Sequence, residues 1–169
     1  MTCTPAPEDL RHALALLSTP ALIRLITEID DNGPIPPRRL STTLCDLPSH
    51  HLRRAADQAR TLGLVHAGPG GGLALAAPGV ALADLYDATA RWARQHAYPA
   101  RLCGFTRRVQ HTFRLLSQPT ADTTSPGPRA AVPLLSSRAA ADLTGPRGLL
   151  LQWLSANPQV LHPEAEAAA

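Results

Sequence analysis

The sequence predicts a mainly α-helical protein that carries one small β-hairpin, and two observations support this fold class. Apolar residues recur at the three- and four-residue spacing of amphipathic helices along most of the chain. A glycine-rich turn at residues 68–72 separates two short apolar runs, which is the pattern of a hairpin. The 169 residues are 44% hydrophobic and 17% charged, so a core can form without disulfide bonds.

The expected elements are bounded by residues that start or stop regular structure. Thr19 is a plausible N-cap with Pro20 at the first helical position, and Ser49 is a natural N-cap further along. Gly63 is expected as a C-cap and Ile35 as a short extended piece. In chain order, we expect helices over 8–18 and 20–30, a short helix within 37–47, a helix over 50–62, strands at 64–66 and 73–75, helices over 79–97 and 100–117, and a last helical region over 134–156 that is broken near Gly145 and Pro146.

The order of these elements predicts the organisation of the chain. Two helices, a short helix, a turn, a helix, a hairpin and a long helix follow one another as in a winged helix-turn-helix DNA-binding domain, here over 8–97. The helix that follows, within 98–117, is expected to serve dimerisation or a pocket. Residues 118–133 are rich in Pro, Thr and Ser and are predicted to be a flexible linker. Residues 134–169 are expected to form a C-terminal helical segment with a frayed tail.

Three motifs that keep a common register lie between residues 52 and 96. They are an L-x3-L-x2-L-x3-G-L-V helix end with alanine in place of two leucines, an L-T-x-x-G turn without its threonine, and a W-A pair. The matching residues are Leu52, Ala56, Ala59, Gly63, Leu64 and Val65 for the first motif, Leu75 and Gly79 for the second, and Trp92 and Ala93 for the third. This pattern resembles the HxlR-type winged-helix transcriptional regulators of the MarR-like superfamily. The resemblance implies DNA binding, but not the cysteine-based sensing of that family, because Cys3 stands at a different distance from the first helix.

Positive charge gathers around the helix expected over 50–62. Five arginines and two acidic residues lie between residues 38 and 60, and a helix-turn-helix places the N-terminal half of its second helix in the major groove. The residues that we expect to contact DNA are Arg38, Arg39, Ser49, His50, His51, Arg53, Arg54 and Arg60. Arg38 and Arg39 would hold phosphate, and Arg53 or Arg54 would reach a guanine edge. The alternative is a solvated helix face on which Arg53 and Asp57 neutralise each other.

The hairpin turn and the aromatic residues bear on the assembly. The turn at 68–72 carries no arginine, so the affinity for DNA would rest on few contacts, and a homodimer is expected to double them. Tyr86, Trp92, Phe105 and Phe113 are candidates for an effector pocket or a dimer surface. Ordinary core packing explains these four aromatic residues at least as well.

Other classes of function find little support in the sequence. His50 and His51 are adjacent and point to different faces, and no catalytic, phosphate-cradling or metal-ligating motif is present, so we expect no enzyme, cofactor or metal. Cys3, Cys45 and Cys103 show no CxxC spacing, and Cys45 is expected to be a small buried residue. No export signal or membrane span is apparent, which predicts a cytoplasmic protein without a membrane partner.

Two hypotheses about function remain. The first is a dimeric, sequence-specific DNA-binding regulator, acting as a repressor and controlled by a small-molecule effector. The second is a winged-helix module for protein interaction or dimerisation that does not bind DNA, and the uncharged hairpin turn favours it.

Overall fold

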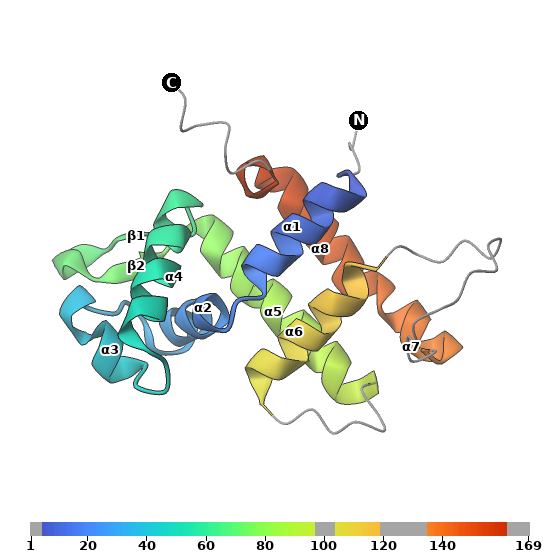
Figure 1. Ribbon diagram of the computed structural model, residues 1–169, viewed down its shortest axis with the longest axis horizontal. Coiled ribbons are helices and arrows are strands. Elements are labelled where there is room, and N and C mark those ends of the chain that lie inside the picture. The colour runs from blue at the N-terminus through green and yellow to red at the C-terminus, as the bar shows by residue number, and fades with distance from the viewer. Residues whose placement is uncertain (1–4, 97–103, 119–134, 162–169) are drawn as a thin grey trace.

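The computed structural model describes residues 5–96, 104–118 and 135–161, and within them the chain is mainly α-helical with one two-stranded antiparallel sheet (Figure 1). The predicted fold class is confirmed at this level. The helices are α1 (Pro7–Leu17), α2 (Pro20–Asn32), α3 (Leu40–Thr43), α4 (Ser49–Thr61), α5 (Ala77–His96), α6 (Phe105–Leu116), α7 (Ser137–Asp142) and α8 (Thr144–Ala156), with 3₁₀ turns η1 (Pro37–Arg39), η2 (Pro69–Gly71) and η3 (Pro158–Val160). The strands are β1 (Val65–Ala67) and β2 (Leu73–Leu75).

The start of α4 differs by one residue from the prediction. Ser49 is the first helical residue, and Pro48 occupies the cap position with an extended backbone. The Pro48 carbonyl accepts hydrogen bonds from the N–H groups of His51 and Leu52, at 3.0 and 3.2 Å. Because proline has no side-chain acceptor, α4 begins without a side-chain cap.

The end of α4 is fixed by backbone hydrogen bonds around Gly63. This glycine follows the C-cap residue and has a φ of +67°, which favours glycine over residues with a Cβ atom. Its N–H donates to the Arg60 carbonyl at 2.9 Å, and the Leu64 N–H donates to the Ala59 carbonyl at 2.8 Å. These two bonds form a Schellman motif, which turns the chain from α4 into β1.

The last helical region breaks at Leu143 instead of at Gly145 and Pro146 as predicted. Pro146 lies in the first turn of α8, where the missing N–H of a proline breaks no helical hydrogen bond. The predicted linker, except for Gln118, and the predicted frayed tail beyond residue 161 lie outside the described residues.

The sheet links the hairpin to the segment before α3. In the hairpin Val65 pairs with Leu75, and on the other edge of β2 an isolated bridge joins Ile35 to Leu73. Ile35 and Leu73 exchange two backbone hydrogen bonds, of 3.1 and 2.8 Å. The extended piece expected at Ile35 therefore fixes the position of η1 relative to the hairpin.

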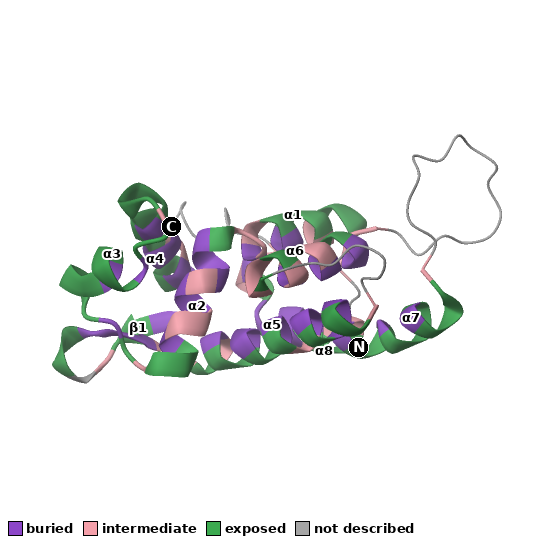
Figure 2. Cartoon of the chain, turned by 90° about the horizontal axis from the view of Figure 1, so that it is seen from below, coloured by how far each residue is buried: buried purple, intermediate pink, exposed green. Residues whose placement is uncertain are grey.

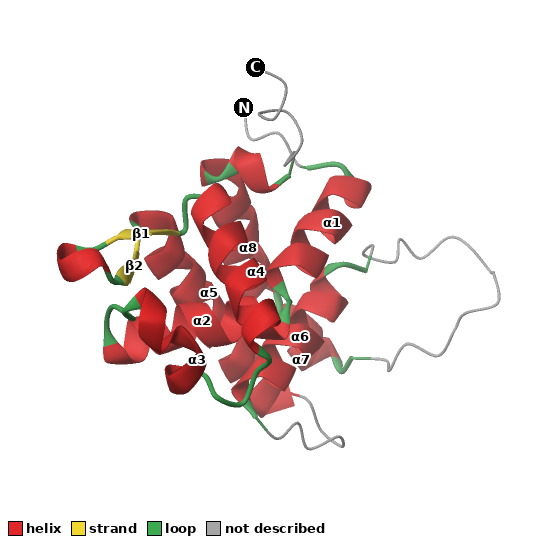
Figure 3. Cartoon of the chain, turned by 60° about the vertical axis from the view of Figure 1, so that its left-hand side comes forward, coloured by secondary structure: helices red, strands yellow, loops and turns green. Residues whose placement is uncertain are grey.

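The core is built around α2 and α5. α2 packs against α4, α5, α6 and β2, and its residues Leu22, Ile23, Leu25 and Ile26 are fully buried. Figure 2 shows the buried residues on the faces of α2 and α5 that point into the molecule, and exposed residues on the outside of α3. α8 packs along α5, where the Trp153 indole donates to the Pro78 carbonyl at 3.0 Å. Figure 3 shows the hairpin beside α3 at one end of this helical body.

Candidate nucleic-acid interface

The candidate interface is centred on α4, which lies against α2. The inner face of α4 consists of Leu52, Ala55, Ala56 and Ala59, all of them buried. The short side chains of the three alanines allow the helix backbone to lie close to α2. The other residues of the helix point outward. All eight residues predicted to contact DNA, namely Arg38, Arg39, Ser49, His50, His51, Arg53, Arg54 and Arg60, are exposed.

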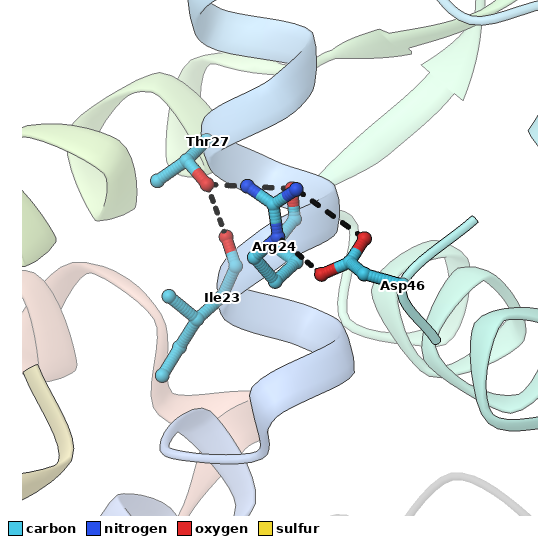
Figure 4. Close-up of polar contacts among 4 residues, drawn as sticks. All are labelled: Ile23, Arg24, Thr27 and Asp46. Carbon is cyan, nitrogen blue, oxygen red and sulfur yellow. Dashed lines mark hydrogen bonds and ion pairs between the residues drawn. The ribbon is translucent and has the colours of Figure 1, made fainter. Parts of the chain in front are cut away.

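An ion pair fixes the segment that leads into α4 (Figure 4). The guanidinium of Arg24, on α2, binds both carboxylate oxygens of Asp46, with Nε–Oδ2 and Nη2–Oδ1 distances of 3.2 and 3.4 Å. The hydrogen bond from Arg24 holds the pKa of the Asp46 carboxyl below its ordinary value of 3.8. Within α2, the Thr27 hydroxyl donates a hydrogen bond to the Ile23 carbonyl, one turn earlier, at 2.7 Å. The pair thus ties the start of α4 to the helix beneath it.

The arginines of α4 differ in their partners. The predicted alternative, an ion pair between Arg53 and Asp57, does not form, because Asp57 binds Arg60 with an Nη1–Oδ1 distance of 2.8 Å. Within the described part of the chain, Arg53 and Arg54 contact no carboxylate. Two of the three arginines on α4 therefore keep an unneutralised charge at the surface, and Arg60 is partly neutralised.

The two unneutralised arginines of α4 face different neighbours. Arg53 and Arg60 line a small hollow of about 120 Å³ together with Pro37 of η1. His51 and Arg54 lie on the opposite edge of α4 and line a larger cleft toward α1. Four predicted contact residues of α4 are therefore distributed along both edges of this helix.

The first turn of α4 adds further donors. The N–H groups of His51 and Leu52 donate to the Pro48 carbonyl, whereas those of Ser49 and His50 have no partner in the described part of the chain. The rings of His50 and His51 meet edge to face, with centroids 4.2 Å apart. Unpaired N–H groups and the positive end of a helix dipole attract anions such as phosphate. The N-terminal half of α4 is therefore suited to an anionic partner.

The hairpin is held closely against the start of α5. A Cβ atom on Gly79 would lie 2.1 Å from the Leu64 carbonyl oxygen, so only glycine fits there. Between β1 and β2 the turn contains Gly70 and Gly71, both with positive φ. The only ionisable side chain over residues 65–75 is His66, which is exposed. The hairpin therefore offers an anionic partner mainly backbone groups.

Three of the four predicted effector or dimer-surface aromatics are buried inside the chain. Tyr86, Trp92 and Phe113 are 0%, 3% and 1% exposed, and Phe105 is half-buried at the core edge. The Tyr86 hydroxyl donates to the Leu17 carbonyl at 2.6 Å, and the Trp92 indole donates to a backbone carbonyl of α7 at 3.1 Å. The expectation of a surface is therefore wrong for Tyr86, Trp92 and Phe113, and the alternative of core packing holds for these three residues.

The described ranges, 5–96, 104–118 and 135–161, offer little support for other types of site. No group of three His, Cys, Asp or Glu residues there is placed to hold a metal ion. Cys45 is an exposed free thiol, so the expectation that it is buried was wrong, and Cys3 and Cys103 lie outside these ranges. No single helix in these ranges is long and apolar enough to cross a membrane.

Comparison with known protein families, curated proteins and solved structures found no match.

The geometry also contains a feature that the sequence reasoning missed, which is the cleft between α1 and α4. His12 and Thr19 line it opposite His51 and Arg54. No local pattern signals this arrangement, because the packing of α1 and α4 on opposite sides of the α2 N-terminus creates it.

Proposed function

We propose that the chain is a winged helix-turn-helix transcriptional regulator of the HxlR type, which binds double-stranded DNA through α4. The observation that carries the proposal is the outward face of that helix. Arg53 and Arg54 remain unneutralised there, next to His50 and His51, at the end of the helix where the dipole is positive. A helix-turn-helix presents this half of its second helix to base edges in the major groove.

In the proposed complex, backbone contacts come from two neighbouring elements. Arg38 and Arg39 lie exposed on η1, which the bridge between Ile35 and Leu73 fixes beside the hairpin. These arginines would bind phosphate and set the register of α4 in the groove. The hairpin would approach the DNA through backbone groups, since its turn bears no cation.

A single chain provides few phosphate contacts, which supports binding as a homodimer. The proposal places this dimer in the cytoplasm as a repressor of transcription. If the charges of Arg38, Arg39, Arg53 and Arg54 together offset four phosphates, the logarithm of the binding constant falls with the logarithm of the salt concentration with a slope of about −3.6. A symmetric dimer doubles this slope to about −7. The salt dependence of binding thus measures both the contact number and the assembly.

The proposal is tested by fluorescence anisotropy with DNA from the region upstream of the coding sequence and with a scrambled duplex, across a salt series. The variant R53E/R54E reverses two charges on α4. The control R91E/R107E changes the net charge equally on exposed residues of α5 and α6. We expect the first variant to lose at least about 30-fold in affinity for the specific DNA, since two guanine contacts contribute about 1–3 kcal/mol each.

The control should lose much less, through long-range charge alone. Equal losses in the two double variants would mean that net charge, and not α4, governs binding. Equal and feeble binding of the wild-type protein to both duplexes would refute DNA recognition.

The second candidate function is a protein-interaction or dimerisation module that does not bind DNA. The observation in its favour is the hairpin, which has no arginine over residues 65–75. For this function the charge of Arg53 and Arg54 is dispensable, so the R53E/R54E variant should retain activity in vivo. Loss of activity in this variant alone would exclude the module.

A further inference from the structure

A groove of about 410 Å³ lies between α5 and α8, which run together along one side of the molecule (Figure 2). Its wall is mainly apolar and includes Leu85 of α5 and Leu149 and Trp153 of α8. The Trp153 indole N–H is already bonded to the Pro78 carbonyl, so the ring contributes only apolar surface. Such a wall is suited to cover apolar side chains of a partner and remove them from water.

The apolar surface continues onto the rim of the groove. Within the described part of the chain, the exposed large hydrophobic residues are Val80 and Leu149, at 45% and 46%. Leu149 lines the groove, and Val80 borders it because it lies one helical turn from both Ala77 and Asp84. Exposed hydrophobic residues that gather at one place mark an interaction surface, whereas scattered ones do not. A partner that covers both residues extends past the groove, which favours a segment of protein over a small molecule.

The charge around the groove is negative. Asp84 is the only ionisable residue that lines it, and Asp30, Asp31 and Asp87 lie near it. Burial raises the pKa of Asp30 above its ordinary value of 3.8, and the charges of the other three aspartates raise it further. None of the four forms an ion pair within the described part of the chain. The groove therefore lies beside uncompensated negative charge, which a cationic partner would neutralise.

Two occupants that this chain itself could supply are disfavoured by their charge. A symmetric pair of copies places the same surface on both sides of the interface, so the four aspartates of one copy would face those of the other. Residues 162–169, which follow this helical region, carry two glutamates and no arginine. Because like charges oppose both arrangements, the occupant is expected to be a basic segment of another protein.

The shape of the groove is suited to a helix. Its lining residues extend from Ala77 to Leu85 on α5 and from Leu149 to Ala156 on α8, which is about two turns of each helix. An amphipathic helix presents apolar residues at three- and four-residue spacing on one face and charged residues beside them. Two or three apolar side chains of such a helix can lie in a groove of this length.

We propose that the groove between α5 and α8 binds a cationic amphipathic helix of a different protein, with apolar side chains in the groove and lysine or arginine beside Asp84 and Asp87. The inference goes beyond the function proposed above and does not depend on it, because no residue that lines the groove belongs to α4, η1 or the hairpin.

The binding test uses the full chain and fluorescein-labelled synthetic peptides, followed by fluorescence anisotropy. The probe is an amphipathic helical peptide with leucine on one face and lysine on the other. One comparison peptide has glutamate in place of every lysine, and a second has the composition of the probe in an order that breaks the apolar face. We expect the probe to bind at least tenfold more tightly than either comparison peptide, with an affinity that falls as salt is added.

Two variants separate the apolar and the charged parts of the site. L149Q removes an exposed apolar contact and should weaken the probe about tenfold. D84N/D87N removes two negative charges and should weaken it about threefold to tenfold, because exposed charge pairs contribute modestly. The matched control E8Q/D9N removes two negative charges from α1, outside the groove, and should bind the probe nearly as the wild-type protein does. Circular dichroism checks that each variant folds.

Four results would overturn the proposal. The first is failure of the wild-type protein to bind the probe. The second is an equal loss in D84N/D87N and E8Q/D9N, which would mean that net charge alone attracts the peptide. The third is equal affinity for the probe and the reordered peptide, because the apolar face would then have no role. The fourth is a dimer, seen in sedimentation of the protein alone, that L149Q dissociates, since it would assign the groove to a second copy of the chain.

Discussion

Replacement of Gly79 by alanine tests how closely the hairpin is held against α5. A Cβ atom at this position would lie 2.1 Å from the Leu64 carbonyl oxygen, and Cβ atoms essentially never come closer than 3.0 Å to such an atom. The Leu64 oxygen is a backbone atom and the position of a Cβ atom is set by the backbone, so rotation of a side chain cannot relieve the contact. The carbonyl also accepts a hydrogen bond from the Ala76 N–H at 2.9 Å, and a shift would weaken that bond.

The free-energy change follows from three contributions. The lost hydrogen bond destabilises by about 1 kcal/mol. Overpacking at a close backbone contact adds about 1–3 kcal/mol. The better helix propensity of alanine stabilises the folded state by at most about 1 kcal/mol. We therefore expect the G79A variant to lose about 1–3 kcal/mol of unfolding free energy.

The matched control is G148A in α8, because a Cβ atom on Gly148 would meet no atom within 4 Å. Helix propensity alone should make this variant about 0.5–1 kcal/mol more stable. Urea unfolding followed by the fluorescence of the buried Trp92 and Trp153 measures both changes. At about 2 kcal/mol per molar urea, the midpoint of G79A should fall by about 0.5–1.5 M. An unchanged midpoint in G79A would refute the close contact, and an equal loss in both variants would assign the effect to glycine replacement in general.

Two further predictions concern buried and exposed polar contacts. The variant Y86F removes the hydroxyl that donates to the Leu17 carbonyl inside the core. It should lower the free energy of unfolding by about 1–3 kcal/mol. A decrease of less than about 0.5 kcal/mol in urea unfolding would contradict this prediction. D46N breaks the exposed pair with Arg24 and should cost about 0.5 kcal/mol at neutral pH. Because the folded-state pKa of Asp46 lies below 3.8, this contribution is present above that pH and is lost as the pH falls through the folded pKa. The unfolding free energies of D46N and wild type should therefore converge in acid, and a constant difference down to pH 2 would contradict the pair.

Most element boundaries could be predicted because their signals are local. Pro20 starts α2 and Gly63 ends α4 through the backbone conformations that these residues favour. The cap of α4 was misplaced because Ser49 and Pro48 are both compatible with a helix start. The break before α8 was misplaced for a similar reason, since a proline in the first turn of a helix looks the same in sequence as a proline that interrupts one.

The candidate site was less predictable because it depends on tertiary contacts. Asp57 has an arginine four residues before it and another three residues after it, and the sequence does not show which one it binds. The burial of Tyr86 and Trp92 depends on α1, α6 and α7 covering the same faces of α5. Helical periodicity identifies an inward face but does not distinguish a core from an interface with another chain.

The proposed function predicts how residues on the two edges of α4 contribute to DNA binding. Arg53 faces η1, while Arg54 faces the cleft toward α1. Neutralising either arginine should weaken DNA binding, whereas replacing the exposed His12 of α1, which lies outside the proposed contact set, should leave it unchanged. This ordering follows only if α4 carries the site, because a general charge effect would not distinguish the arginines of α4 from an exposed arginine elsewhere, such as Arg91 of α5.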